Sequence, residues 1–393
     1  MKKILIAARE LDCGGTEVAM LNLLKNLNSS RFDITLLLFR KRGVYLSKIP
    51  SYVKVVEIPF NKEADRYYIS DDDKLLKNSI QKIYVKNIRK TISYINRYVK
   101  KVNYRKDLYY KFLLNKTYEL NEEFDLVLDF FGYGGFQTAY VAEKVKAKNK
   151  IMWIHDERIK IMKTTRCFFD KFTYFFGVSK ACVNSFVRAF PETKDRIDVF
   201  YNFIDINEIL KKAEEKIGIE FEKDKFNLVT VGRLEWQKGY DIAIEVAKRL
   251  RDENISFCWY VLGDGSCREA LQSKINYYKL NDKFILLGRV DNPYPYIKKS
   301  NLYIQTSRHE GYGLAIAEAR VLNKGIVSTD LECVREQIIN GETGYLVPCN
   351  VNEFSNILLT LHNNEGLIKI LENNLKGEKE SYEKELLKLE EFL

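Results

Sequence analysis

Short apolar runs alternate with amphipathic segments along most of the chain. In the first half, the run KKILIAA precedes the helical pattern GGTEVAMLNLLKNL, and the run FTYFFGVSK precedes ACVNSFVRAF. Apolar strands that alternate with helices of about ten to fifteen residues are typical of parallel α/β units. The pattern therefore predicts a doubly wound domain over residues 1–205.

This alternation stops at residues 206–225, which are charged and contain no apolar run. It resumes at FNLVTVGRL and continues through DIAIEVAKRL, ISFCWYVLGDG, KFILLGRV, NLYIQTS and KGIVSTD. We expect a linker at 206–225 and a second doubly wound α/β domain at 226–375. The remaining residues, 376–393, form a charged pattern with a Leu/Phe stripe that predicts a helix.

The bulk composition is that of a globular protein. Of its residues, 46% are hydrophobic and 30% are charged. A chain of 393 residues is too long for one ordinary core, so we expect two domains. The opening MKKILIAARELDCGG is too short an apolar run for a signal peptide, and Arg9 and Glu10 interrupt it. Seven cysteines show no metal-ligand spacing and indicate reduced thiols. We therefore expect a cytoplasmic protein.

The net charge of +10 is concentrated in a basic insert, predicted at 61–120. Between Lys74 and Lys116 there are thirteen Lys or Arg residues and one acid, Asp107. Apolar residues recur there three and four apart, which indicates one or two basic amphipathic helices. An anionic membrane would attract each basic residue by about 1 kcal/mol, so we expect peripheral binding at the inner face of the membrane. The alternative is that the basic segment only forms a solvated charged face of the protein. We interpret the DDD string at 71–73 as solvated surface and not as a metal site.

No nucleic-acid-binding motif accompanies this basic charge, so we expect no nucleic-acid partner.

Open α/β sheets bind ligands beyond the carboxyl ends of their strands. After the first strand, Gly14 and Gly15 precede a helix, where backbone amides can approach a phosphate. The alternative is that glycine is needed at Gly14 and Gly15 only for the geometry of the turn between strand and helix. After FNLVTV come Arg233 and Lys238, a pair of cations that suits a diphosphate.

Two acids, Glu310 and Glu318, flank the Gly-X-Gly loop of SRHEGYGLAIAEA. The pattern predicts a helix that begins near Gly313 or Leu314, with Glu310 before it and Glu318 about 6 Å along its axis. Between them lie the free amides of the helix start. A nucleotide sugar has a matching shape, because its diphosphate separates two groups rich in hydroxyls that carboxylates can accept from. Repulsion from the two acids is offset by the upstream cations.

Six segments of the second half, in this order, resemble the retaining glycosyltransferases of family four (glycosyl transferases group 1), which have the GT-B fold. They are VGRLEWQKGYD, VLGDG, LLGRV, SRHEGYGLAIAEA, GIVSTD and NGETGYLVP. In the first half GGTE, WIHDE, GVSK and YNFID fit more loosely, and the basic insert has no counterpart.

The resemblance implies two Rossmann-like domains that face each other across a cleft, an acceptor-binding domain at 1–205 and a nucleotide-sugar-binding domain at 226–375. The helix within 376–393 would cross back to the first domain. Glu318 would take the ribose and Glu310 the transferred sugar, with the Gly14–Gly15 loop closing on the diphosphate. The implied donor-binding set is Gly14, Gly15, Arg233, Lys238, Arg289, Val290, Glu310, Gly311, Tyr312, Gly313, Leu314 and Glu318, with Arg289 and Val290 near the base.

The implied catalytic set is Glu310, His155, Arg233 and Lys238. His155 ends the strand KIMWI, where similar enzymes contact the donor sugar or the acceptor, and Asp156 is a weaker candidate. A structural role for His155 is the alternative. By analogy, the leaving diphosphate takes the acceptor proton on the same face of the sugar, and amides and cations stabilise its charge. The mechanism needs neither a metal nor a cofactor.

The predicted function is retaining transfer of a hexose or N-acetylhexosamine from a nucleotide sugar to a glycan or lipid-linked acceptor in surface polysaccharide assembly, with capsule among the settings. UDP is favoured over GDP only because it is more frequent in such families. Two alternatives stay open: a non-catalytic partner subunit with the same fold, and a sugar-nucleotide epimerase.

Overall fold

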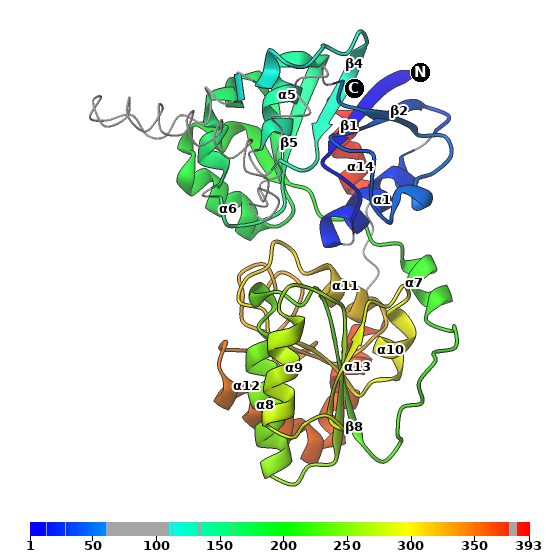
Figure 1. Cartoon of the computed structure of the whole chain (residues 1–393), viewed down its shortest axis with the longest axis vertical. Coiled ribbons are helices and arrows are strands. Elements are labelled where there is room, and N and C mark those ends of the chain that lie inside the picture. The colour runs from blue at the N-terminus through cyan, green and yellow to red at the C-terminus, as the bar shows by residue number, and fades with distance from the viewer. Residues whose placement is uncertain are drawn as a thin grey trace, which may run out of the picture.

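The computed structural model describes residues 1–12, 14–27, 29–59, 110–111, 113–132, 135–159, 161–376 and 383–393. It contains two parallel sheets, each in its own domain (Figure 1). The first sheet has the strand order β3-β2-β1-β4-β5-β6-β7 and the second β10-β9-β8-β11-β12-β13. This confirms the predicted α/β fold of two doubly wound domains. Most of the basic insert lies outside the described residues, as do the DDD string and the positions proposed to bind lipid.

The first sheet is built from β1 (Lys2–Ala8), β2 (Phe32–Leu38), β3 (Lys54–Glu57), β4 (Glu123–Asp129), β5 (Lys146–Ile154), β6 (Tyr174–Gly177) and β7 (Ile197–Val199). Its principal helices are α1 (Gly15–Asn26), α5 (Phe136–Lys144) and α6 (Lys180–Ala189). Short 3-10 helices are η1 (Leu46–Lys48), η3 (Ile161–Thr164), η4 (Arg166–Lys171) and η5 (Pro191–Arg196).

The second sheet is built from β8 (Phe226–Val231), β9 (Phe257–Leu262), β10 (Phe284–Gly288), β11 (Leu302–Gln305), β12 (Ile326–Thr329) and β13 (Tyr345–Val347). The accompanying helices are η6 (Trp236–Lys238), α8 (Tyr240–Asp252), α9 (Arg268–Tyr277), α10 (Tyr294–Lys299), α11 (Leu314–Val321), α12 (Val351–Asn363) and α13 (Glu365–Leu375). The start of α11 at Leu314 agrees with the sequence prediction.

Strand β5 shows how the sequence delivers a site residue. Its first half, KAKNK, is partly exposed, whereas its second half, IMWI, is fully buried between β4 and β6. The indole of Trp153 packs against the rings of Phe176 and Phe200, with centroid distances of 5.4 and 4.5 Å. This aromatic packing fixes the strand end, and the next residue, His155, is therefore held at the carboxyl edge of the sheet.

The chain joins its two domains at two places. The first place is the segment expected to be a plain linker, which contains helix α7 (Ile206–Lys212). The sequence did not reveal this helix, because charged residues surround its single buried position, Ile209. Helix α14 (Glu383–Glu390) lies in the first domain beside β1 and α1 (Figure 1). There Glu390 pairs with Arg31 at 2.6 Å. Within the described residues, no helix is both long and apolar enough to cross a membrane.

Candidate active site

A cavity of about 1350 Å³ lies between the domains. Its walls are formed by the carboxyl ends of strands from both sheets and by the starts of α1 and α11. Every residue that the sequence predicted for the site lines this one cavity: Gly14, Gly15, His155, Arg233, Lys238, Arg289, Val290, Glu310, Gly311, Tyr312, Gly313, Leu314 and Glu318. The structure thus brings all of them together; their individual roles remain predictions.

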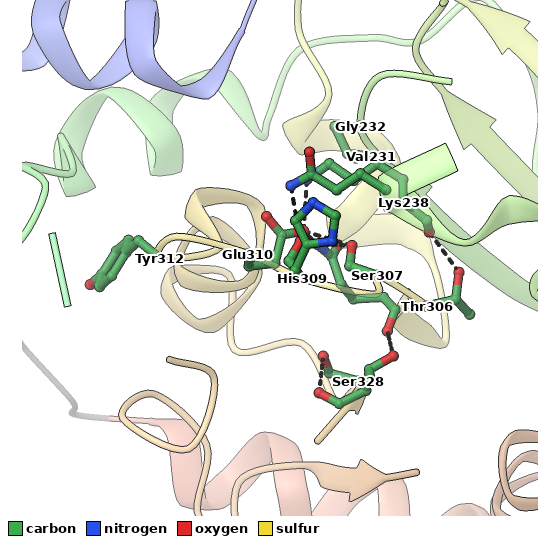
Figure 2. Close-up of polar contacts among 12 residues, drawn as sticks. Val231, Gly232, Lys238, Thr306, Ser307, His309, Glu310, Tyr312 and Ser328 are labelled. Carbon is green, nitrogen blue, oxygen red and sulfur yellow. Dashed lines mark hydrogen bonds and ion pairs between the residues drawn. The ribbon is translucent and has the colours of Figure 1, made fainter. Parts of the chain in front are cut away.

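Glu310 is a buried carboxylate held by three donors. Figure 2 labels it together with two of them, Lys238 and Ser307. Its Oε1 accepts from Lys238 Nζ at 2.7 Å, Ser307 Oγ at 2.6 Å and Gln305 Nε2 at 2.5 Å. All three contacts are to Oε1, so in the described part of the chain Oε2 keeps its lone pairs for a ligand. A buried charge requires such pairing, since an isolated one would be costly.

Lys238 therefore does more than the sequence suggested, because it neutralises Glu310 as well as lining the cavity. Gly239 permits this arrangement. Its φ is +66°, and a Cβ there would come within 2.0 Å of the Thr306 carbonyl oxygen. Thr306 Oγ1 also donates to the Lys238 carbonyl at 3.0 Å (Figure 2). The glycine thus lets the cation-bearing loop approach the end of β11.

Glu318 lies on α11 and accepts a hydrogen bond at Oε1 from the hydroxyl of Tyr294 at 3.1 Å. Burial raises the pKa of Glu318 to about 7, and the Tyr294 contact opposes part of that rise. Proton uptake by this group therefore falls in the physiological range. Tyr294 was missed from the sequence, because a tyrosine between two prolines after β10 carries no distinctive signal.

The Gly-X-Gly loop owes its glycines to two different constraints. Gly313 has a φ of +90°, which suits glycine at the start of α11. At Gly311 the constraint is space, because a Cβ would lie 1.8 Å from the carbonyl oxygen of His155 in the other domain. The Gly-X-Gly loop, called the donor loop below for the role that we propose for it, therefore touches the backbone of His155 directly.

His155 is buried, and its ring Nε2 lies 2.7 Å from the carbonyl oxygen of Phe130. A carbonyl only accepts, so we assign the proton to Nε2. Burial lowers the pKa of His155 to about 3, although the Phe130 contact acts in the opposite direction. His155 is consequently a neutral hydrogen-bonding group at pH 7. Asp156 beside it is engaged by Arg158, with Nη2 to Oδ2 at 2.6 Å.

The start of α1 and Arg233 line the same cavity, and the charge of Arg233 acts on Glu17 of this helix. The carboxylate of Glu17 folds back over Gly14, where a Cβ would lie 2.5 Å from its Oε2. Burial raises the pKa of Glu17 to about 7, and the positive charge of Arg233 lowers it in turn. The sequence motif GGTE contains this acid, but the spacing gave it no role.

In the part of the chain that the structure describes, no group of three or more His, Cys, Asp and Glu side chains is arranged to hold a metal ion.

Two Rossmann-like domains around one interdomain cavity define the GT-B class of fold. Over the whole chain, the structure is similar to that of Anabaena HepE in complex with UDP and glucose, with a TM-score of 0.69, 16% identity and coverage of 100% of this chain and 99% of that one. It is equally similar to a mutant of S. aureus TarM in complex with Fondaparinux, alpha-GlcNAc-glycerol and UDP, with the same TM-score, identity and coverage.

Residues 211–378 match the family described as glycosyl transferases group 1. A curated relative from Campylobacter jejuni subsp. jejuni is 30% identical over 208 residues, covering 52% of this chain and 55% of the relative. It is N-acetylgalactosamine-N,N'-diacetylbacillosaminyl-diphospho-undecaprenol 4-alpha-N-acetylgalactosaminyltransferase. The chain spans about half the length of the curated relatives it matches.

Proposed function

We propose that the protein is a glycosyltransferase that moves a hexose or N-acetylhexosamine from a nucleotide sugar, UDP-linked in preference to GDP-linked, to a glycan or lipid-linked acceptor in surface polysaccharide assembly. The observation that carries the proposal is the convergence on one interdomain cavity of the Glu310–Lys238 pair, the start of α11 and Glu318. Support also comes from solved neighbours that hold UDP and UDP-glucose, and from a relative that is named for transfer to a glycan on diphospho-undecaprenol.

In this proposal the diphosphate docks on the free amides at the start of α11, between the two acids. Helix N-termini favour anions because their amides lack partners and the dipole is positive there. Ribose then reaches Glu318, and the sugar reaches Glu310 Oε2. Arg289 and Val290 line the same cavity, and in this proposal they would contact the base. The Gly14–Gly15 loop closes on the diphosphate from the first domain.

Charge on the leaving diphosphate is stabilised by Arg233, Lys238 and the helix amides. Lys238 is shared, because it also balances Glu310 at 2.7 Å. His155, which burial keeps neutral by lowering its pKa, would contribute a hydrogen-bonding ring beside the sugar. The acceptor proton passes to the leaving oxygen on the same face, so the reaction proceeds with retention and without a metal. No residue of the chain then needs to form a covalent sugar intermediate.

The acceptor enters from the first domain, where the cavity wall includes Phe39, Phe131 and Phe136 together with Arg9 and Lys48. Aromatic faces suit sugar rings, and cations suit the phosphates of a lipid-linked acceptor. We further propose that the basic insert binds the inner face of the membrane and so holds the site close to a lipid-linked acceptor.

The deciding experiment measures thermal shifts with a panel of UDP- and GDP-sugars, followed by transfer assays with the best donor. We expect one UDP-sugar to stabilise the protein and to be consumed only when a glycan or lipid-linked acceptor is present, with an α-linked product from an α-linked donor. Donor binding without transfer to any acceptor would favour a non-catalytic partner subunit. Conversion of the donor to an epimer would identify an epimerase.

A further inference from the structure

A carboxylate of the second domain docks on the start of α6 in the first domain. Glu336 Oε2 accepts from the backbone N–H of Lys180 at 3.0 Å, and its Oε1 accepts from that of Ala181 at 3.2 Å. These amides lack partners within the helix, and the helix dipole favours a negative charge there. Helix α6 carries no acid in its own first turn. Glu336 therefore supplies, from the other domain, the negative charge that this helix start lacks.

The same helix start also holds the donor loop. The hydroxyl of Ser179 accepts from the Cys182 backbone N–H at 3.1 Å and donates to the Gly311 carbonyl at 2.7 Å. The Cys182 thiol donates to that carbonyl as well, at 3.3 Å. Gly311 in turn lies against the His155 carbonyl. Docking at α6 thus fixes the distance between the donor loop and His155.

Tyr201 connects this contact to the crossing between the domains. Its hydroxyl donates to Glu336 Oε2 at 3.0 Å, and its backbone N–H donates to Glu385 of α14 at 3.2 Å. Its ring lies 5.9 Å from the ring of Tyr312 in the donor loop. Tyr201 follows β7 just before the chain leaves the first domain. Tyr201 belongs to the first domain and Glu336 to the second, so the hydrogen bond between them is lost if the domains separate.

We propose that Glu336 is a positioning residue for the sugar transfer, because its contact with α6 maintains the closed arrangement in which Glu310 and His155 face the same sugar. This inference rests on the proposed function. The two side chains come from different domains, so their distance depends on domain closure. Three hydrogen bonds to one half-buried carboxylate, two of them from a helix start, form an electrostatically matched contact.

The test compares Glu336→Gln with Glu332→Gln. Glutamine keeps the size of Glu336 but replaces one accepting oxygen with an amide that faces a backbone N–H. Glu332 also reaches across the domains, to Asn184 Nδ2 at 3.0 Å, but it is exposed and contacts no helix start. It is the matched control. Neither glutamate lines the cavity. Most of the proposed UDP contacts lie within the second domain and stay intact in both variants, and only the contact with the Gly14–Gly15 loop depends on domain closure.

We expect E336Q to lower kcat by about tenfold or more, since the closed population falls by that factor, while the Kd for UDP changes by less than about threefold. Small-angle scattering with bound UDP should show a larger radius of gyration for E336Q than for the wild type. E332Q should match the wild type in all three measurements. Tyr201→Phe removes one of the three bonds and should give a smaller effect of the same kind.

Scattering separates this inference from the proposed function. If no donor is ever transferred, an expanded E336Q beside a compact E332Q still supports the docking role, and only the proposed function fails. If E336Q is as compact as the wild type and turns over equally fast, the inference is overturned while the function stands. Should E336Q not fold, Tyr201→Phe provides the same comparison.

Discussion

Lys238→Met tests how the buried charge of Glu310 is balanced. The Lys238 Nζ lies 2.7 Å from Glu310 Oε1, and the two side chains are only 19% and 7% exposed. Removing the ammonium leaves a buried carboxylate without its counter-charge. Breaking a buried ion pair in this way costs about 3–5 kcal/mol. Two neutral donors, Gln305 and Ser307, stay on the same oxygen, so we expect a smaller loss, about 2–3 kcal/mol, at or below the lower end of that range.

The double variant Lys238→Met/Glu310→Gln should recover part of this loss, because a neutral glutamine needs no counter-charge and still accepts from the same two donors. We expect a recovery of about 1–2 kcal/mol. Free energies of unfolding come from urea titrations followed by tryptophan fluorescence, since two of the three tryptophans, Trp236 and Trp259, lie in the second domain.

Lys248→Met is the matched control in that domain. It removes an ammonium 3.1 Å from Asp252, but both side chains there are about two-fifths exposed, at 40% and 45%. Exposed pairs contribute about 0–1 kcal/mol. The reasoning fails if Lys238→Met costs no more than Lys248→Met, or if adding Glu310→Gln deepens the loss.

Three further predictions address the ligands. Glu318→Gln should weaken UDP binding by about 1–3 kcal/mol; in the wild type, affinity should fall as pH drops through about 7, the pKa to which burial raises Glu318. Calorimetry should measure UDP affinity across that pH range and find this dependence absent from E318Q. Glu17 also has a pKa of about 7, so Glu17→Gln is measured in parallel to separate its contribution. Transfer should persist in excess EDTA; loss that Mg²⁺ or Mn²⁺ restores contradicts the metal-free mechanism. Replacing the seven Lys and Arg residues between positions 82 and 101 by Gln should abolish salt-sensitive sedimentation with anionic vesicles without changing UDP affinity; equal sedimentation with neutral and anionic vesicles would leave the insert as a solvated surface.

Periodicity predicted the architecture because parallel strands buried on both faces are written as continuous apolar runs. It failed where an element has little apolar content. Helix α7 has one buried residue among charged neighbours, and α10, which carries Tyr294, has only six residues. Such elements are stabilised by tertiary contacts that no local pattern records.

The site residues were predictable because they follow strands, where the fold collects them. Their partners were not. Gln305 is a polar residue at the end of an apolar strand, and its contact with Glu310 depends on the path of the loop between them. Glu336 and Ser179 lie in different domains, and nothing in their spacing indicates that they meet the same helix start. Contacts between domains arise only when both domains are folded.

The return of the chain to the first domain has a consequence for how the protein is made. Phe392 covers the ring of Tyr174 at 5.0 Å, Lys388 pairs with Asp198 at 3.5 Å, and Glu385 accepts from the backbone of Tyr201. All three contacts join the first domain to residues that the ribosome adds after the whole second domain. During synthesis, the first sheet must therefore wait with this edge uncovered while the second domain emerges and folds. A fusion or truncation placed beyond residue 383 is thus a change to the first domain, although it lies at the opposite end of the sequence.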